Sequence, residues 1–374
     1  MRYEQPNLFF INSQNEDILT DILKDLVGGY WKFSNFTHHE SNVMKGVRNR
    51  ADYEPVLPNL VPIETRQKWN IINHKIEEEI FTPQIKESGI EDFLIKSKNF
   101  FDKFSNKKIG VQLSGGIDSS IIIGLLKFFE IPHALIGYCT HKYDFRTELF
   151  IQKLLASNTQ QSILIDYEDY LPYSGLENIP PHQHPDMTCC GFSSNQAMAG
   201  ACFDAGVDIL LTGCGGDLAL GDKITPSECN WIPAIFNYTW LQDIIYTHKG
   251  VHLISFFSDP AILECIWNLR RGQQADPEKL WARAFFRDFL PKELVDYTYK
   301  ADFWGLYIDG LVNSIPEIHA FHKQAHNLSG NPYFEEANLN DILRNDLFNC
   351  DQKLYQRLDA RISAAVWINS LLAA

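Results

Sequence analysis

The chain has 374 residues, of which 45% are apolar and 21% are charged, so it is long enough for a large buried core and two domains and is neither disordered nor fibrous. Its formal net charge of -14 disfavours non-specific binding to nucleic acid or to anionic membranes. The eight cysteines include no CxxC pair of the kind that binds a metal, and we expect them to be reduced and structural.

Residues 1–88 have the fewest interpretable features. They begin without a basic stretch followed by a sustained apolar run, so we expect no secretory signal. No apolar stretch in the chain approaches the length of a membrane span, and we expect a cytoplasmic protein without membrane attachment. Helix-like patterns at residues 16–27 and 65–80 predict two helices, but no catalytic motif lies here. We predict that residues 1–88 form a small N-terminal domain and residues 89–374 a second one.

Short apolar runs alternate with helical patterns in the second region. The runs lie at 109–113, 134–138, 162–165 and 207–211, and the helical patterns at 90–104, 119–129, 146–156 and 194–205. This alternation predicts βαβ units and an α/β fold with a doubly wound, mostly parallel sheet and flanking helices. From about residue 230 the pattern is mostly helical, which predicts a helical C-terminal extension. Ligands of such sheets bind at the carboxyl ends of the strands, where two glycine-rich turns fall.

The turn after the first run, SGGIDSS at 114–120, combines features suited to phosphate binding. Gly115 and Gly116 let the backbone approach a ligand closely, and the following helix directs N–H groups and its positive dipole end to the same place. Asp118 would repel phosphate by itself, so it indicates a divalent cation. The alternative is a tight turn capped by an aspartate, but the order of hydroxyls, glycines and aspartate favours a nucleotide site.

This segment resembles the SGGxDS signature of the PP-loop ATP pyrophosphatases, which include asparagine synthetases, β-lactam synthetases and tRNA thiolases. The resemblance implies cleavage of ATP between its α and β phosphates, giving AMP and pyrophosphate. It also implies the PP-loop, or HUP-like, form of the doubly wound sheet. The ATP-binding residues that we predict are Leu113, Ser114, Gly115, Gly116, Asp118, Ser119, Ser120, Ile136, Gly213 and Gly215.

The second glycine-rich turn, TGCGGDLALG at 212–221, resembles the second conserved loop of the asparagine synthetase group. In that group the aspartate of this loop shares a magnesium ion with the aspartate of the first loop. The resemblance therefore implies Mg²⁺ held by Asp118 and Asp217. Cys214 and Leu218 stand where asparagine synthetases usually have glutamate, and the end of the loop is closer to the β-lactam synthetase form.

Two later segments also resemble this group. EKLWAR at 278–283 implies that Glu278 orients or deprotonates the attacking amine. KADF at 300–303 implies that Lys300 contacts the α phosphate and pyrophosphate and stabilises the charge that develops on transfer, although Thr298 stands where an arginine is common. For both candidates the alternative is an ordinary charged residue on the surface.

Glutamine-dependent members of the group begin with a glutaminase domain whose nucleophile is a cysteine directly after the initiating Met. Here position 2 is Arg2, no cysteine precedes Cys139, and the region before the first turn is too short for such a domain. We therefore expect residues 1–88 to be degenerate or unrelated to a glutaminase. The nitrogen would come from ammonia, a partner glutaminase, or an amine on the substrate itself.

Together these features predict an ATP-dependent ligase of specialised metabolism that adenylates a carboxylate and couples it to an amine or ammonia, within one molecule or between two. Its cofactors would be ATP and Mg²⁺, and its partners a small-molecule or peptide carboxylate and an amine, with no nucleic acid; a homodimer is compatible with the sequence. One alternative is a PP-loop sulfur transferase that uses Cys189, Cys190 or Cys214. Another is a non-catalytic nucleotide-binding module, because two usual acidic positions near Asp217 are missing.

Overall fold

The computed structural model describes two short strands near residues 67–78, most of the chain from 88 to 329, and a few positions from 358 to 370. Within 88–329, residues 143–144, 181–186, 222–239, 272 and 297–302 lie outside the description. The chain divides into two compact units. The first, called the sheet unit here, consists of Ile80–Pro172 and Ser193–Asp309, and the second consists of Met1–Glu79, Tyr173–Phe192 and Gly310–Ala374. The boundary expected near residue 88 stays a prediction.

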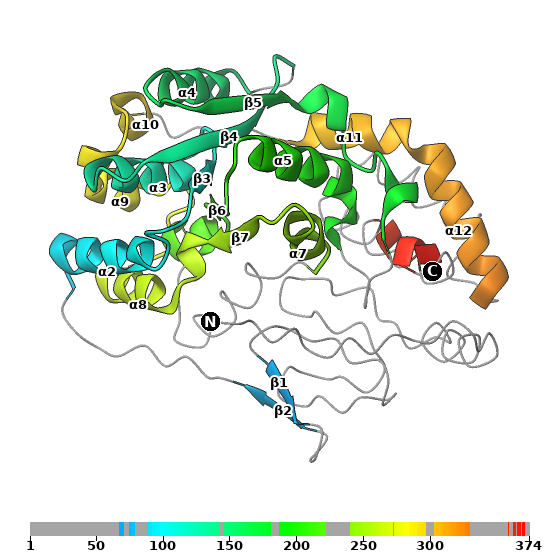
Figure 1. Ribbon diagram of the computed structural model, residues 1–374, viewed down its shortest axis with the longest axis horizontal. Helices are drawn as coiled ribbons and strands as arrows, with labels where there is room; N and C mark the ends of the chain where they lie inside the picture. Colours follow the sequence, from blue (N-terminus) through cyan, green and yellow to red (C-terminus); the bar gives the residue numbers. More distant parts are fainter. Residues whose placement is uncertain are drawn as a thin grey trace. The chain divides into compact units, whose positions relative to one another are not determined.

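A parallel sheet of five strands forms the centre of the sheet unit (Figure 1). Val111 in the central strand lies opposite Leu135 on one side and Leu211 on the other. The parallel sheet and its flanking helices agree with the predicted doubly wound α/β class. In the spatial order β5-β4-β3-β6-β7, the strands are β5 (Ser162–Asp166), β4 (His133–Cys139), β3 (Ile109–Gln112), β6 (Ile209–Thr212) and β7 (His252–Ser255).

Strands β3, β4, β5 and β6 of this sheet confirm the four predicted runs, whereas β7 was not predicted. In β3 and β6 almost every residue is buried, because helices cover both faces of the sheet, and this burial requires a continuous apolar run. Strand β7 pairs with β6 at the edge of the sheet. Its His252 is exposed and only Ser255 is fully buried, so its sequence lacks the apolar run that marks the inner strands.

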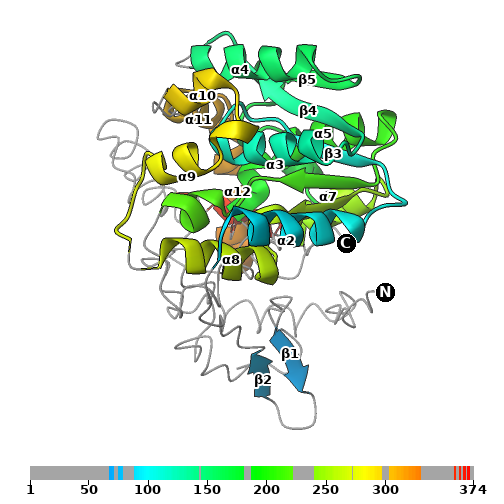
Figure 2. The ribbon, with the colours of Figure 1, turned by 90° about the vertical axis from the view of Figure 1, so that its left-hand side faces the viewer.

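The longer helices of the sheet unit cover both faces of the sheet. Helices α2, α3, α4 and α8 lie on one face, and α5 and α7 on the other (Figures 1 and 2). The helices predicted at 90–104, 119–129, 146–156 and 194–205 are confirmed to within two residues at each end. The bounds are α2 (Ile90–Asp102), α3 (Ile117–Phe128), α4 (Arg146–Ser157), α5 (Phe192–Asp204), α7 (Trp240–Thr247) and α8 (Pro260–Arg270).

Further helices and short helical turns follow or connect these elements. After α8 come α9 (Leu280–Phe285), α10 (Lys292–Asp296), α11 (Trp304–Asn313) and α12 (Ile315–Ser329), which confirm a mostly helical C-terminal region apart from β7. No helix in the described ranges is both long and apolar enough to cross a membrane. The short turns are η2 (Tyr167–Tyr170), η3 (Leu176–Asn178), η4 (Met187–Gly191), η5 (Asp217–Gly221), η6 (Phe256–Ser258) and η7 (Arg287–Phe289).

The helix predicted over residues 65–80 is wrong. Two antiparallel strands, β1 (Gln67–Asn70) and β2 (Lys75–Glu78), occupy this segment instead, with Trp69 opposite Ile76. A segment this short shows helical spacing only weakly, so its apolar pattern did not decide between a helix and two strands. The helix predicted at 16–27 lies outside the described residues.

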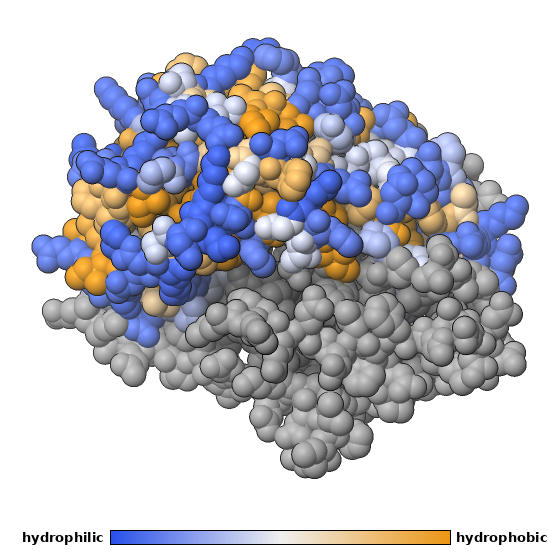
Figure 3. Space-filling model, in the orientation of Figure 1, coloured by the Kyte–Doolittle hydropathy of each residue, from blue (hydrophilic) through white to orange (hydrophobic). Residues whose placement is uncertain are grey.

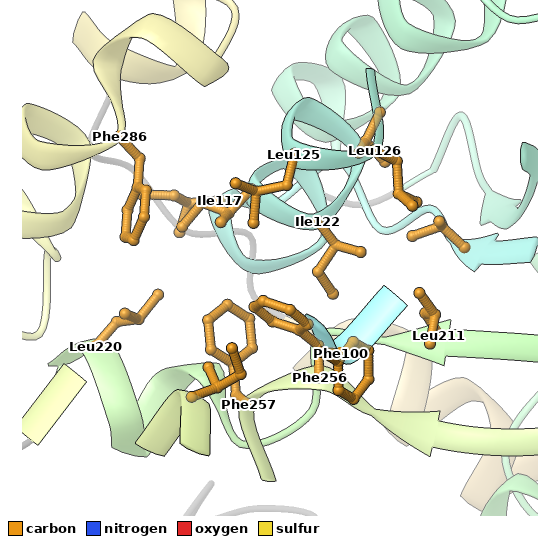
Figure 4. Packing of buried hydrophobic residues seen from close by; sticks show 14 of the residues in the cluster. Phe100, Ile117, Ile122, Leu125, Leu126, Leu211, Leu220, Phe256, Phe257 and Phe286 are labelled. Carbon is orange, nitrogen blue, oxygen red and sulfur yellow. The ribbon is translucent and has the colours of Figure 1, made fainter. Parts of the chain in front are cut away.

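A cluster of buried apolar side chains fixes α3 on the sheet (Figure 4). Ile122 and Leu125 of α3 have no exposed surface, and Phe100 of α2 and Phe256 of η6 belong to the same cluster. The Phe100 and Phe256 rings meet edge to face with their centroids 5.2 Å apart. Burial of each such side chain contributes roughly 1.5–3 kcal/mol. The cluster thereby fixes the position of the turn that precedes α3.

In the coloured part of Figure 3 the surface is mainly hydrophilic, with apolar areas between the polar ones. The large apolar side chains that remain exposed on the sheet unit come from separate elements: Ile95, Phe128, Phe150, Phe203, Leu280 and Phe303. Apolar residues scattered over a surface are normal for a folded chain.

Gly124 lies in the middle of α3, where the helix contacts the backbone of η7. A Cβ at this position would lie 2.1 Å from the carbonyl oxygen of Phe289. This distance leaves no room for any side chain, and the obstructing atom is backbone. The glycine in an otherwise apolar helix is therefore explained by close packing against η7.

We expect Gly124→Ala to lower the free energy of unfolding by about 1–3 kcal/mol, because the methyl group forces α3 away from η7. Gly200→Ala is the matched control: this residue lies within α5, a Cβ there meets nothing within 4 Å, and alanine favours a helix. Guanidinium unfolding followed by circular dichroism should show a lower midpoint for the first variant and an unchanged or higher midpoint for the second. Equal midpoints would contradict the packing of α3 on η7.

Candidate active site

Both glycine-rich turns lie at the carboxyl ends of adjacent strands. The chain passes from β3 through α3 to β4 on one side, and after β5 it returns to β6 on the other side of β3. The point between β3 and β6 is therefore where the strand order reverses. In doubly wound sheets this point is the usual place for ligand binding. The turns at 114–120 and 212–221 meet there.

The first turn needs glycine at position 115 for reasons internal to the protein. Gly115 has φ +82°, and a Cβ there would lie 2.4 Å from the backbone oxygen of Glu148 in α4. The backbone N–H of Gly116 donates to the Ser114 hydroxyl at 3.2 Å, and that hydroxyl is hydrogen-bonded to the hydroxyl of Ser119 at 2.9 Å. Ser114 is exposed, so its hydroxyl is the one that the turn presents to solvent.

Ser119 and Ser120, which we predict to contact phosphate, are both buried in the first turn of α3. Their hydroxyls donate to the carbonyl oxygen of Gly116 at 3.3 and 2.8 Å, respectively. They hold the turn against the helix it precedes. A helix that begins at Ile117 provides its amino-terminal N–H groups beside these hydroxyls.

The second turn is shaped to receive Asp118. A Cβ on Gly216 would lie 2.4 Å from Cγ of Asp118, and a Cβ on Gly213 would lie 2.9 Å from Cβ of Asp118. Gly215 has φ +82°, which an L side chain rarely adopts. Three glycines of this turn are thus explained by the packing of the two turns against each other and by backbone conformation.

Neighbouring groups fix the second turn to the sheet. The backbone N–H of Cys214 donates to the hydroxyl of the buried Thr212 at 2.8 Å. The carbonyl of Cys214 accepts a hydrogen bond of 2.7 Å from Ser255, the last residue of β7. The unpredicted strand therefore supports the site directly.

Lys279 joins the two turns. Its Nζ lies 2.7 Å from each carboxylate oxygen of Asp118 and 2.7 Å from Oδ1 of Asp217. Lys279 is 5% exposed, whereas the Asp217 side chain is 60% exposed. The two aspartates that we predict to share a metal ion are thus brought together, and an ammonium group lies between them. This lysine was not predicted as a site residue.

The segment that carries Lys279 packs on the one-turn helix η5, which begins at Asp217. The backbone N–H of Asp276 donates to the carbonyl of Gly221 at 2.6 Å, and the N–H of Lys279 donates to the carbonyl of Asp276 at 2.9 Å. The buried Arg270 of α8 also donates to η5, to the carbonyl of Ala219, at 3.0 Å. These contacts give Lys279 its position relative to Asp217.

Gln152 is a further residue that sequence reasoning missed. It is buried in α4, and its amide nitrogen lies within hydrogen-bonding distance of three carbonyl oxygens: Leu113 at 3.2 Å, Ser114 at 3.2 Å and Tyr138 at 2.6 Å. It thus ties the carboxyl ends of β3 and β4 to α4. The available signal was a neutral polar residue between the apolar Ile151 and Leu155 of a helix.

The remaining predicted site residues do not all lie beside the two aspartates. Leu113 and Ile136 are fully buried, and the N–H of Leu113, the residue after β3, donates to the carbonyl of Ile136 in β4 at 2.8 Å, so both residues serve the packing of the sheet. Glu278 is exposed, and its carbonyl accepts from the buried Arg283 at 2.9 Å. The structure does not place its carboxylate on the Asp118–Asp217 pair. Lys300 lies outside the described residues.

Cys214 lies at the carboxyl end of β6 beside the two aspartates. The residue keeps an exposed surface, but protein atoms surround the thiol, and this burial raises its pKa above the ordinary value. The negative charges of Asp118 and Asp217 raise the pKa further. A thiol with a raised pKa carries little thiolate at neutral pH and is a poor nucleophile.

The pair of carboxylates fits a magnesium ion that is shared with phosphate. Among the described residues no group of three or more His, Cys, Asp or Glu side chains could hold a metal ion. Mg²⁺ is commonly bound through one or two carboxylates plus substrate phosphates and water, and Asp118 and Asp217 supply the two carboxylates. These residues would therefore hold the ion together with a nucleotide rather than as a complete protein cage.

Comparison with known proteins adds no family: no protein-family model matches the chain, and no curated protein sequence matches it. The functional interpretation therefore depends on the geometry of Asp118, Asp217 and Lys279 and on the motifs that contain them.

Gln152→Leu should lower the free energy of unfolding by about 1–3 kcal/mol, because the carbonyl oxygens at the strand ends lose the two N–H donors that Gln152 directs at them. Gln273→Leu makes the same chemical change at an exposed position and should alter stability by less than about 0.5 kcal/mol. Chemical unfolding measures both values. Similar losses in the two variants would show that Gln152 does not hold the ends of β3 and β4.

Proposed function

We propose that this chain is an AMP-forming ligase that joins a carboxylate to an amine at the expense of ATP. One observation carries the proposal: Asp118 and Asp217 converge from two glycine-rich turns on a single cationic centre at the switch point of a parallel sheet. Carboxylates facing each other beside a helix amino terminus suit a metal-bound phosphate, because the metal offsets their repulsion of the phosphate. The resemblance of the first turn to PP-loop enzymes supports ATP as the nucleotide.

The proposed reaction has two steps. A carboxylate oxygen of the substrate attacks the α phosphorus of ATP, the bond from that phosphorus to the bridging oxygen breaks, and pyrophosphate leaves with the electron pair. The amine nitrogen then attacks the acyl carbon, the bond from that carbon to the AMP oxygen breaks, and an amide, AMP and a proton result. Positioning and neutralisation of charge account for most of the acceleration in such a reaction.

Different residues are proposed to bind the phosphates, hold the metal ion and orient the amine. The exposed Ser114 hydroxyl and the amino end of α3 bind phosphate oxygens, and Asp118 and Asp217 would hold Mg²⁺. When bound, that ion neutralises and orients the phosphates. Lys300, at the position that the motif gives it, is proposed to stabilise the charge on the leaving pyrophosphate. Glu278, which is exposed next to Lys279 in the chain, is proposed to orient the amine.

The sulfur transferase alternative receives less support. Cys189 is 1% exposed, and its sulfur lies 3.3 Å from the hydroxyl of Ser363 within the second unit. Cys214 is at the site, but its raised pKa disfavours the thiolate. The acidic net charge also argues against a tRNA substrate. We therefore favour nitrogen over sulfur as the incoming atom.

Release of pyrophosphate tests the proposal. Candidate acids and amines are screened for substrate-dependent release of pyrophosphate from ATP, and the product is identified by mass spectrometry. Asp118→Asn and Asp217→Asn should each lower the rate roughly 10²-fold or more, because each removes a ligand and a charge from the phosphate site. Asp204→Asn, the same change at an exposed helix end, should leave it unaltered. Release of ADP, or no turnover with any acid, would count against the ligase and favour a different nucleotide enzyme or a binding module.

Lys300→Ala should abolish turnover and leave ATP binding largely intact, because its proposed role is in the transition state. Lys292→Ala is a control at an exposed position of α10. Single-turnover kinetics and ATP titration by fluorescence or calorimetry separate the two effects. Unchanged turnover would remove Lys300 from the site.

A further inference from the structure

The Lys279 ammonium lies where the two site carboxylates converge. Its three N–H donors match three acceptors, namely both oxygens of Asp118 and one oxygen of Asp217, each at 2.7 Å. A magnesium ion that bridges the same side chains needs oxygens of both about 2.0–2.1 Å away. The ammonium and a bridging ion therefore compete for one place. Two such positive charges side by side repel each other strongly when protein shields them from water.

The protein holds Lys279 in this place by its backbone. Lys279 has φ +56° and ψ 38°, a left-handed conformation that a non-glycine residue keeps only when its surroundings enforce it. Its carbonyl accepts from the N–H of Arg283 at 2.9 Å and its N–H donates to Asp276, so both backbone groups are bonded. A Cβ on Gly221 would lie 3.6 Å from Cγ and Cε of Lys279, which places the aliphatic stem alongside the second turn.

Solvent reaches the two carboxylates unequally. Lys279 and Asp118 are largely enclosed, with side-chain exposures of 6% and 20%, whereas Asp217 is 60% exposed. A cation from solvent therefore reaches the open side of Asp217 first. It gains the second carboxylate only if the ammonium leaves Asp118.

We propose that Lys279 is an internal counter-ion that holds the two turns together without nucleotide and is displaced from Asp118 and Asp217 when a divalent cation binds. The inference rests on the proposed function only in taking these two aspartates as the metal ligands. A free divalent ion must break the ammonium contacts, but an ion that arrives with a nucleotide brings phosphate oxygens as further ligands. The site thus favours the metal–nucleotide complex over the free metal.

Binding of Mn²⁺ without nucleotide tests the competition directly. The full-length protein is titrated with Mn²⁺, and the concentration of free Mn²⁺ is measured by electron paramagnetic resonance. Lys279→Met should bind Mn²⁺ at least about tenfold more tightly than the wild type, because the competing charge is gone. Lys279→Arg, which retains the charge, should bind as weakly as the wild type, and Lys292→Met, at an exposed position, should match it too. Equal affinity in Lys279→Met and the wild type would overturn the proposal.

Displacement is measured on the unaltered chain, which covers the case in which Lys279→Met does not fold. Acylation of lysines by a water-soluble anhydride, read by mass spectrometry, should modify Lys279 slowly without metal, since the side chain is buried and bonded. Saturating Mn²⁺ should increase its modification several-fold and leave Lys292 unchanged. Lys279 that stays protected with Mn²⁺ bound would overturn displacement. Neither readout uses ATP turnover, so failure of the ligase assay with these results intact would reject only the ligase.

Discussion

The ion pair between Lys279 and the carboxylates of Asp118 and Asp217 is the contact on which the candidate site depends. It joins a turn after β3, a turn after β6 and a segment 161 residues beyond Asp118. Two carboxylates on facing loops repel each other, so their convergence requires a cation between them. A partly buried pair of this kind has a large desolvation cost that offsets its attraction. Its main effect is therefore to fix the relative position of the turns rather than to add much stability.

The glycines of the two turns are required by the packing of the protein itself, whether or not a ligand is bound. Gly213 and Gly216 leave room for Asp118, and Gly115 leaves room for the backbone of α4. A glycine-rich turn is often explained by close approach of a nucleotide, but these positions are already required by protein packing. The evidence for a nucleotide therefore comes from the convergence of two carboxylates beside a helix amino terminus at the switch point of the sheet, more than from glycine content.

The parts of the fold that the sequence could predict are those with dense local signals. Inner strands such as β3 and β6 are apolar throughout because both faces are covered, and α2 to α5 have clear helical spacing. Strand β7 was not predicted because an edge strand can be polar. Strands β1 and β2 were mistaken for a helix because each has only four residues, too few to show a two-residue alternation clearly. Asp118 and Asp217 could be assigned to one site through the resemblance of their two turns to the asparagine synthetase group, and the structure places both carboxylates on Lys279. Lys279 could not, because its place depends on a left-handed backbone and on packing against η5.

The three parts of the site differ in how firmly the protein holds them. The ends of β3 and β6 are tied to the sheet, to Gln152 and to Ser255, and a large apolar cluster fixes the helix that follows β3. The segment at 276–279 is held mainly by a few backbone hydrogen bonds and by the ion pair itself. A change in the charge between the carboxylates therefore acts on the least regular of the three parts and leaves the sheet unaltered. In the proposed exchange the carboxylates would keep their positions while one cation replaces another between them, and binding of a metal with its nucleotide would be a local event.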